Sequence, residues 1–210
     1  MFSYLEASRI LRVAPEFQDL SLKIRNLSID TRTINPGDLF VAFQGDNSDG
    51  HDFLKAAFGK GASGALIDIR RKGVALAGSR DAGKGVKNLI PVVDPQAAMT
   101  ELAAEYRKTL PVKVIGITGS VGKTTTKEFL FYLLRQKYSV LATAGNLNNH
   151  LGVPIMLSRL EPAHQYCVME MGASHPGEIG YLSKLAKPSG GILTPIGPAH
   201  LEGFGSLENV

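Results

Sequence analysis

The sequence predicts an α/β protein. It has a small N-terminal α/β block over residues 1–109 and a doubly wound parallel-sheet block, incomplete in its sheet, over residues 110–210. Three observations lead to this fold class. After residue 110, short apolar runs alternate with helix-like segments of about ten residues or more, which indicates parallel strands joined by crossover helices. A glycine-rich turn joins the first of these strands to its helix. The chain has 210 residues, 44% hydrophobic and 20% charged, which is enough to bury a core in each of two blocks.

The N-terminal block consists of short apolar runs separated by turn-forming residues. Asn35-Pro36-Gly37-Asp38 is a turn signal ahead of the first of these runs, and alanines recur at helical spacing after Pro95. In chain order we expect a strand at 38–43, a helix at 52–59 that ends on glycine, a strand at 64–68, a glycine- and lysine-rich mobile loop at 72–87, a strand at 89–93 and a helix at 95–108.

The second block alternates strand and helix without interruption. The expected elements are strands at 112–117, 139–142, 166–171 and 190–194, with helices at 123–136, 151–160 and about 177–186 between them. The last five residues, 206–210, are typical of the opening turn of a helix capped by Ser206. Because nothing follows this turn, we expect the chain to be a fragment.

Charge and hydropathy exclude several classes of protein. The net charge is +4, and the basic residues are scattered apart from the short patch Arg70-Arg71-Lys72, so we expect no nucleic-acid partner. No apolar run reaches the roughly 18–20 residues that span a bilayer. The first six residues lack the basic region and apolar block of a secretory signal. We therefore expect a cytoplasmic protein that does not insert into a membrane. We also expect a monomer.

Cys167 is the only cysteine in the chain, so no intrachain disulfide can form and a reducing cytoplasm is compatible. It lies in the apolar run at 166–171. We expect it to be a small core residue rather than a nucleophile.

The segment after strand 112–117 has the layout of a phosphate-binding loop. Its glycines let backbone N–H groups face an anion, the helix N-terminus adds positive potential, and Lys123 supplies a mobile cation. The Thr124 hydroxyl would then contact a nucleotide-bound Mg²⁺. The general motif has a glycine where this chain has Ile117, so only the tighter G-x-x-G-K-T form matches. The structural alternative is a glycine-rich turn with a surface lysine. The candidate nucleotide-binding residues are Gly119, Ser120, Val121, Gly122, Lys123, Thr124 and Thr125.

Two further side chains follow strands of the second block. Glu170 ends the strand at 166–171, and a carboxylate there can bind Mg²⁺ directly or through water. Its alternative is a solvated acid at a strand end. His200 lies after the strand at 190–194, where it could bind a second metal, contact a phosphate in the transition state, or merely stabilise its loop. Both follow carboxyl ends of strands, where such sheets bind ligands.

Three amides gather in the turn before the helix at 151–160, namely Asn146, Asn148 and Asn149. We call this turn the asparagine loop. Asparagine caps helices and adopts left-handed backbone conformations, so a structural role alone would be reasonable. Three within four residues exceed what capping needs. We expect them to donate hydrogen bonds to a polar ligand.

Two polar segments of the first block are weaker candidates. Thr31 and Arg32 precede a turn, where they could hold a diphosphate or a sugar or simply form a polar β-turn. Asp49, Gly50 and His51 belong to a loop that is either capped or faces a ligand.

Taken in chain order, these segments resemble the Mur ligases, the amide-bond ligases of peptidoglycan synthesis. The resemblance spans nearly the whole chain and is closest to the branch that adds D-alanyl-D-alanine to UDP-N-acetylmuramoyl-tripeptide. The asparagine loop is the most specific element, since the branch that adds the third peptide residue would be expected to carry a threonine-rich segment there. The matching segments are 30–32, 37–42, 49–51, 116–128, 145–154, 170–172 and 197–202.

The resemblance implies a three-domain ligase that uses ATP and Mg²⁺ and forms an acyl-phosphate. It implies an N-terminal domain that holds the UDP end of the substrate and a central ATPase, with Lys123, Glu170 and His200 as catalytic residues and Thr124, Glu170 and His200 as metal ligands. The implied substrate-binding residues are Thr31, Arg32, Asp49, Gly50, His51, Asn146, Asn148 and Asn149. The family's carbamylated lysine and C-terminal domain would lie beyond Val210, so we expect the fragment alone not to turn over.

Other hypotheses stay open at this point. A sister ligase that adds the third peptide residue, or one of the folylpolyglutamate type, would share most of these motifs. A nucleotide-dependent switch would favour a guanine-reading N/T-K-x-D segment, which the sequence lacks. A UDP-sugar-binding module without catalysis is the remaining alternative.

Overall fold

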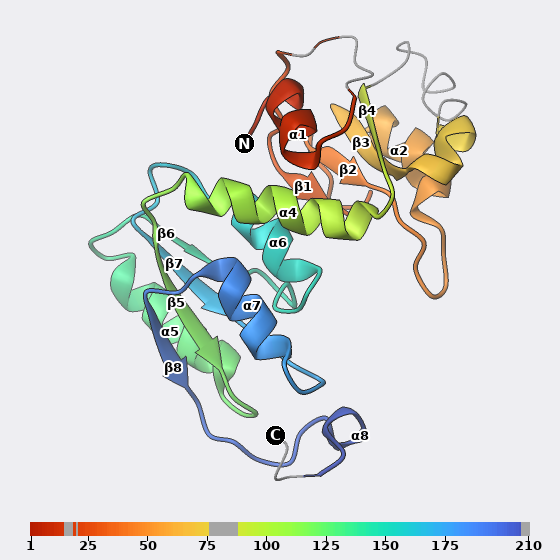
Figure 1. Ribbon diagram of the computed structural model, residues 1–210. Coiled ribbons are helices and arrows are strands. Elements are labelled where there is room, and N and C mark those ends of the chain that lie inside the picture. The colour runs from red at the N-terminus through yellow and green to blue at the C-terminus, as the bar shows by residue number, and fades with distance from the viewer. Residues whose placement is uncertain (15–18, 20, 76–87, 207–210) are drawn as a thin grey trace. The chain divides into compact units, whose positions relative to one another are not determined.

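The computed structural model describes residues 1–14, 19, 21–75 and 88–206. It divides into two compact units, Met1–Tyr106 and Arg107–Val210. The boundary falls near the end of helix α4 (Pro95–Lys108), which starts in the first unit (Figure 1). No helix in the described ranges is long and apolar enough to cross a membrane.

The first unit is built on a four-stranded parallel sheet in the order β1-β2-β3-β4. Its strands are β1 (Leu27–Ser28), β2 (Leu39–Val41), β3 (Gly64–Asp68) and β4 (Asn88–Val92). At the start of β3 a Cβ on Gly64 would lie only 2.2 Å from the Asn88 carbonyl oxygen and 2.4 Å from the Tyr4 hydroxyl. The close approach of β4 and α1 therefore requires glycine at this position.

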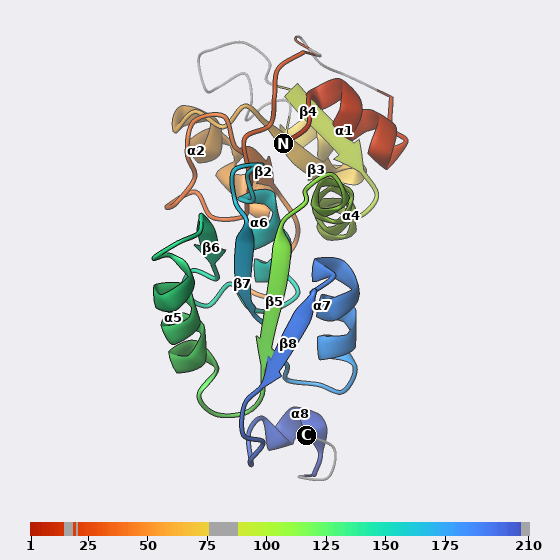
Figure 2. The same cartoon turned by 90° about the vertical axis from the view of Figure 1, so that its left-hand side faces the viewer.

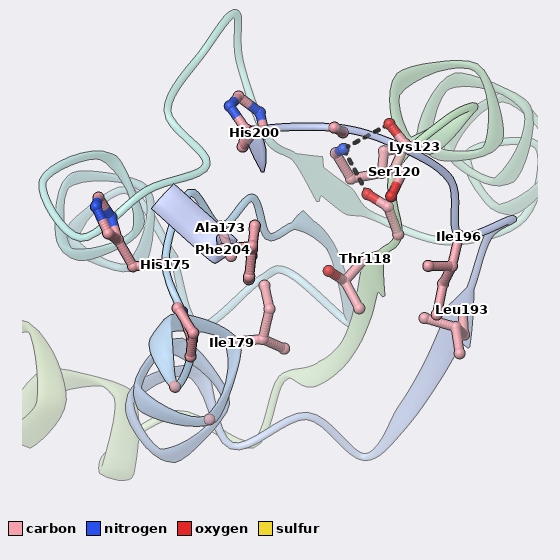
Figure 3. A pocket seen from close by; sticks show the side chains of 15 residues that line it. Thr118, Ser120, Lys123, Ala173, His175, Ile179, Leu193, Ile196, His200 and Phe204 are labelled. Atoms are coloured by element: carbon pink, nitrogen blue, oxygen red, sulfur yellow. Dashed lines mark hydrogen bonds between the residues drawn. The ribbon is translucent and has the colours of Figure 1, made fainter. Parts of the chain in front are cut away.

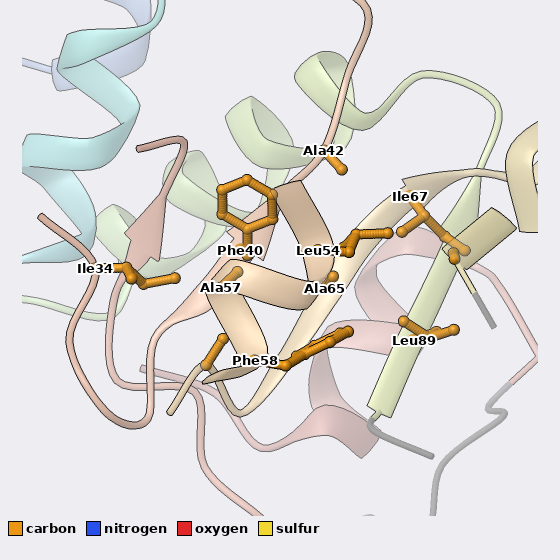
Figure 4. Packing of buried hydrophobic residues seen from close by; sticks show 11 residues of the cluster. Ile34, Phe40, Ala42, Leu54, Ala57, Phe58, Ala65, Ile67 and Leu89 are labelled. Atoms are coloured by element: carbon orange, nitrogen blue, oxygen red, sulfur yellow. The ribbon is translucent and has the colours of Figure 1, made fainter. Parts of the chain in front are cut away.

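Helices cover this sheet and complete its core. They are α1 (Tyr4–Leu11), η1 (Gly50–Phe53), α2 (Leu54–Gly59) and η2 (Ile69–Arg71). Figure 4 shows α2 packing Leu54 and Phe58 against residues from β2, β3 and β4. Phe40 and Phe58 are each only 1% exposed, and burying a side chain of this size contributes roughly 1.5–3 kcal/mol to stability.

The second unit is a parallel sheet in the order β6-β7-β5-β8. The strands are β5 (Lys113–Thr118), β6 (Val140–Ala142), β7 (Tyr166–Glu170) and β8 (Gly190–Leu193). The helices are α5 (Lys123–Leu134), α6 (Gly152–Ser158), α7 (Glu178–Ala186) and α8 (Leu201–Phe204). The chain leaves β5 toward β6 through α5 and returns toward β8 through α7, so α5 and α7 lie on opposite faces of the sheet (Figure 2).

The predicted parallel-sheet α/β class is confirmed, and two elements, β3 and α4, have the predicted bounds. Helix α1, strand β1 and helix α8 were not predicted. The prediction of a loop over 72–87 is wrong at its start, because residues 72–75 are helical and bury Ala75 in the core. Residues 76–87 and the helical turn predicted from Ser206 onward, at 207–210, lie outside the described residues. Cys167 is buried in β7, as predicted.

Candidate functional site

The glycine-rich loop joins β5 to α5 and has a backbone that only glycine tolerates. Gly119 has φ of +133°, and a Cβ on it would lie 2.2 Å from the Thr194 hydroxyl oxygen. Gly122 has φ of +85° and is the N-cap of α5. The first turn of α5 therefore begins directly after the loop, and the N–H groups of that turn have no partner within the helix. This arrangement favours an anion at the helix N-terminus.

The loop is held by the segment after β8 and by its own lysine. Pro195 accepts hydrogen bonds at its carbonyl oxygen from the backbone N–H groups of Ser120 and Val121, at 3.1 and 3.3 Å. Lys123 bends back so that its Nζ donates to the carbonyl oxygens of Gly119 and Ser120, at 2.6 and 3.3 Å (Figure 3). The ammonium group thus lies over the loop, where it would meet a bound phosphate.

Glu170, the last residue of β7, receives two side-chain hydrogen bonds. The Thr124 hydroxyl donates to Oε2 at 3.0 Å, and the Asn148 amide donates to Oε1 at 2.9 Å. We call Thr124, Asn148 and Glu170 the Glu170 cluster. Glu170 is 3% exposed. The three members of the cluster come from the first turn of α5, the loop after β6 and the end of β7. Because β7 pairs directly with β5, the carboxylate lies beside the phosphate loop.

The donor set of the Glu170 cluster fits Mg²⁺, which binds one or two protein oxygens together with phosphate oxygens and water. Thr124 and Glu170 supply a hydroxyl and a carboxylate oxygen within hydrogen-bond distance of each other. His200 is exposed, and within the described ranges no three or more His, Cys, Asp or Glu side chains gather as a metal site. The structure thus brings together Thr124 and Glu170 but does not add His200 to them.

The loops after β5, β7 and β8 meet around a cavity of about 350 Å³. Thr118 at the end of β5 and Lys123 at the start of α5 line it on either side of the first loop, His175 lines it from the second loop and His200 from the third (Figure 3). His200 has φ of +52° and directly precedes α8, and its backbone carbonyl accepts the N–H groups of Gly203 and Phe204 at 3.0 and 3.1 Å. Three polar segments that follow strand ends in the sequence therefore surround one space. This agrees with the rule that parallel α/β sheets bind ligands beyond the carboxyl ends of their strands.

The asparagine loop has partners for two of its three amides. Asn148 contacts Glu170 through its side chain, and its carbonyl accepts the Gly172 N–H at 2.8 Å. Asn149 accepts at its side-chain oxygen from the N–H groups of Leu151 and Gly152, at 3.1 and 2.9 Å, which stabilises the start of α6. Asn146 is exposed. The substrate-binding role of this loop stays a prediction.

Thr31 and Arg32 follow the carboxyl end of β1. Arg32 pairs with Asp30 through Nε and Nη2, at 2.7–3.0 Å, while its side chain remains 87% exposed. The Lys60 ammonium donates to the Thr31 carbonyl oxygen at 2.8 Å. Two cationic side chains are therefore present at this strand end, where a ligand of a parallel sheet would bind.

Asp49 and His51 are buried, at 8% and 4% exposed, in a hydrogen-bonded cluster. The Asp68 N–H donates to His51 Nε2 at 3.0 Å, so the ring proton is on Nδ1, which lies 2.6 Å from an Asp49 oxygen. Arg71 pairs with the other oxygen of Asp49. Burial raises the Asp49 pKa, but the hydrogen bonds from the His51 backbone and ring and from Arg71 outweigh it, lowering the pKa to about 2.

The segment from Asp49 to His51 is thus held tightly inside the first unit. A Cβ on Gly50 would lie 2.8 Å from the Phe43 backbone nitrogen. Sequence reasoning placed Arg71 only in a basic patch and missed its pairing with Asp49. Since the two are separated by 22 residues, no local pattern indicates this contact.

Two family models match the chain: the Mur ligase middle domain over residues 117–210, and the Mur ligase family, catalytic domain, over residues 23–107. The UDP-N-acetylmuramoyl-tripeptide–D-alanyl-D-alanine ligase of Escherichia coli K12 is 41% identical over 93% of this chain and 40% of its own length. The ligase of the same name from Bacillus subtilis 168 is 37% identical over 89% of this chain and 39% of its own length.

Solved structures agree with these matches. A crystal structure of MurF from Acinetobacter baumannii superposes with a TM-score of 0.80 at 34% identity, covering 99% of this chain and 44% of that one. The structure of MurF ligase from Thermotoga maritima in complex with ADP superposes with a TM-score of 0.69 at 35% identity, covering 88% of this chain and 40% of that one. A UDP-N-acetylmuramoyl-L-alanyl-D-glutamate–2,6-diaminopimelate ligase, at 17% identity and a TM-score of 0.53, shares the fold.

This chain therefore spans about 40% of the length of the curated relatives that it matches. Both family models, the sequence relatives and the solved structures agree across its two units. The chain belongs to the Mur ligase family.

Proposed function

We propose that this chain supplies the UDP-substrate and ATP sites of a ligase that joins D-alanyl-D-alanine to UDP-N-acetylmuramoyl-tripeptide. The observation that carries the proposal is that the Glu170 cluster lies beside the phosphate loop. The hydroxyl and carboxylate of the cluster and the ammonium of Lys123 in the loop are the groups that a Mg²⁺-nucleotide would need there. The names of its relatives, at 41% and 37% identity, supply the substrates of the proposal.

Each block has a proposed role. Residues 1–109 would hold the UDP end of the substrate at the carboxyl edge of the first sheet, with Thr31 and Arg32 at the end of β1. The buried positions of Asp49 and His51 support an indirect part for them, namely fixing the loop after β2. Residues 110–210 would bind ATP, with its phosphates against residues Gly119 to Thr125.

The side chains around the phosphate loop would divide the work of phosphoryl transfer. Lys123 and the first-turn N–H groups of α5 would hold the phosphates, and Thr124 with Glu170 would hold the Mg²⁺. When bound, this ion neutralises charge on the transferring group. His200 lines the same cavity as Lys123, so it would contact the phosphates or a second metal ion from the opposite loop. These side chains position charge and take no covalent part.

The proposed reaction has two steps. An oxygen of the terminal carboxylate of the tripeptide attacks the γ-phosphorus of ATP, and ADP leaves with the electrons of the broken P–O bond. The amine of D-alanyl-D-alanine then attacks the acyl carbon of the resulting acyl-phosphate. A tetrahedral intermediate collapses, phosphate leaves with the C–O electrons, and the amine proton passes to solvent. The buried position of Glu170 would hold its carboxylate in one place through both steps.

The substrate preference is proposed to depend on the asparagine loop. The contact of Asn148 with Glu170 places this loop next to the proposed nucleotide site. An exposed neighbour such as Asn146 would therefore contact a substrate carboxylate that approaches the nucleotide. We also propose that the protein works as a cytoplasmic monomer. Its one cysteine is buried in β7, which suits a reducing compartment.

The proposal is tested by phosphate release from ATP in the complete gene product. Release should require both UDP-N-acetylmuramoyl-tripeptide and D-alanyl-D-alanine. Release with UDP-N-acetylmuramoyl-dipeptide and a diamino acid instead would assign the protein to the sister ligase. ATP hydrolysis that is independent of every acceptor would contradict a ligase.

A further inference from the structure

Lys127 is a buried lysine on the helix that follows the phosphate loop. Its exposure is 3%, which is rare for a lysine. It lies three residues after Thr124 on α5, so both side chains leave the helix on the same face, toward the sheet. The Lys127 ammonium donates to the Thr143 carbonyl oxygen at 2.9 Å and pairs with Glu128 at 2.8 Å. Removing a cation from water is unfavourable unless such partners compensate it.

Thr143, which accepts from Lys127, is also bonded to β7. It follows β6, is 2% exposed, and its N–H donates to the Val168 carbonyl oxygen at 3.0 Å. Its hydroxyl oxygen accepts the backbone N–H of Glu170 at 2.9 Å. One buried threonine thus connects the ammonium of Lys127 to the backbone of Glu170.

The two contacts from α5 reach Glu170 from different sides. Thr124 holds the carboxylate directly, at 3.0 Å, whereas Lys127 reaches the backbone of the same residue through Thr143. A methionine or leucine at 127 would fill the space with less loss of hydration. A buried ammonium costs more desolvation free energy than these apolar side chains would. Its presence beside a phosphate site is therefore explained if the position of the strand end that it fixes matters for the site.

We propose that Lys127 is a positioning residue that fixes the end of β6 and, through the Thr143 hydroxyl, the backbone of Glu170. The carboxylate is thereby held at the place where Thr124 and a nucleotide-bound cation meet it. The structural part of this inference concerns the ligand-free chain alone. Its consequence for Mg²⁺ rests on the proposed function.

The structural part is tested in the absence of metal and nucleotide by amide hydrogen exchange of Glu170. Lys127→Met removes the ammonium at similar volume, and Lys184→Met, on the exposed face of α7, removes the same charge elsewhere. We expect exchange of the Glu170 amide to be at least tenfold faster in Lys127→Met and unchanged in Lys184→Met, with partial rescue in Lys127→Arg. Unchanged exchange in Lys127→Met would overturn the inference.

A second pair of variants keeps the test decisive if Lys127→Met does not fold. Thr143→Val removes the hydroxyl that accepts the Glu170 N–H, whereas Thr143→Ser retains it. Glu170 exchange should accelerate in Thr143→Val and not in Thr143→Ser. Equal exchange in the two variants would show that the hydroxyl does not hold Glu170, and this result too would overturn the inference.

The consequence for the cation is measured with a fluorescent ADP analogue, titrated with and without Mg²⁺. In Lys127→Met and Thr143→Val the factor by which Mg²⁺ tightens binding should fall several-fold, while binding without Mg²⁺ stays near wild type. An unchanged factor would contradict a role in holding the cation site. If the wild-type chain and Lys123→Ala bind the analogue equally, the proposed nucleotide site fails instead, and the exchange result still decides the role of Lys127.

Discussion

The Thr124 hydroxyl donates to a carboxylate oxygen of Glu170 at 3.0 Å and so joins the first turn of α5 to the end of β7. The two residues are 46 positions apart, and they meet because β7 pairs beside β5 in the sheet. Asn148 occupies the other oxygen of the same carboxylate. One buried acid at the end of β7 therefore holds the first turn of α5 and the loop after β6.

Lys123→Ala should weaken nucleotide binding and leave stability nearly unchanged. Within the part of the chain that the structure describes, the ammonium donates to two carbonyl oxygens of its own loop, so its loss leaves no buried charge there unpaired. We expect at least a tenfold weaker affinity for ADP, which corresponds to ~1.4 kcal/mol. Calorimetric titration together with thermal unfolding measures both, and Lys184→Ala is the control. An unchanged affinity would remove the phosphate-loop assignment.

Gly119→Ala should damage the loop and the fold together. The added methyl group would meet Thr194, and φ of +133° is unfavourable for alanine, so we expect a loss of about 1–3 kcal/mol. Gly180→Ala on α7 is the matched control, since a Cβ there has no heavy atom within 4 Å. Urea unfolding measures both. Equal stability of the two variants would show that the contact with Thr194 does not constrain the loop.

The neighbouring amides Asn148 and Asn149 should affect different properties, namely nucleotide binding with Mg²⁺ and stability, respectively. Asn149→Ala removes the acceptor for two N–H groups at the start of α6, and we expect it to cost about 1 kcal/mol of stability. Asn148→Ala frees one oxygen of Glu170 and should instead reduce the tightening of nucleotide binding by Mg²⁺. Unfolding and titration of both variants separate the effects. Identical behaviour would mean that the loop acts as one structural unit.

Acid should destabilise the first unit through Asp49. The folded-state pKa of Asp49, about 2, lies below the usual aspartate value of 3.8, so its contribution to stability is complete above about pH 4 and is lost as the pH falls toward 2. The shift corresponds to about 2 kcal/mol. In urea unfolding from pH 7 to pH 2, Asp49→Asn should lose less stability than wild type across this interval, with the exposed Asp52→Asn as control. Parallel curves for Asp49→Asn and wild type would contradict the assignment.

Local pattern was enough to predict β3 from its continuous apolar run and α4 from the helical spacing of its apolar residues. It was also enough to place Glu170 at a strand end, because a polar residue after an apolar run marks that end. Helix α1 was readable from Ser3 and Glu6, which form a capping box, although the prediction did not use it. By contrast, the pairing of Arg71 with Asp49 depends on how distant segments pack, and sequence periodicity carries no such information.

The same distinction applies within the candidate site. The sequence identified Lys123 and Thr124 because the motif is continuous, and it identified His200 from its place after a strand. It missed Lys127 and Thr143, whose roles exist only once α5 packs on β6 and β7. Burial of a lysine is decided by the tertiary structure, so its type and position in the sequence gave no signal.

Glu170 is proposed to hold the cation of a nucleotide bound at the phosphate loop. The most direct measurement is calorimetric titration of this chain with ADP, with and without Mg²⁺, for wild type and Glu170→Gln. Glutamine keeps an oxygen for Thr124 and the volume of the side chain but removes the charge. If Glu170 holds the cation, Mg²⁺ will tighten ADP binding to wild type and have little effect on Glu170→Gln, while metal-free binding will be similar in both. Equal tightening by Mg²⁺ in the two proteins would contradict it.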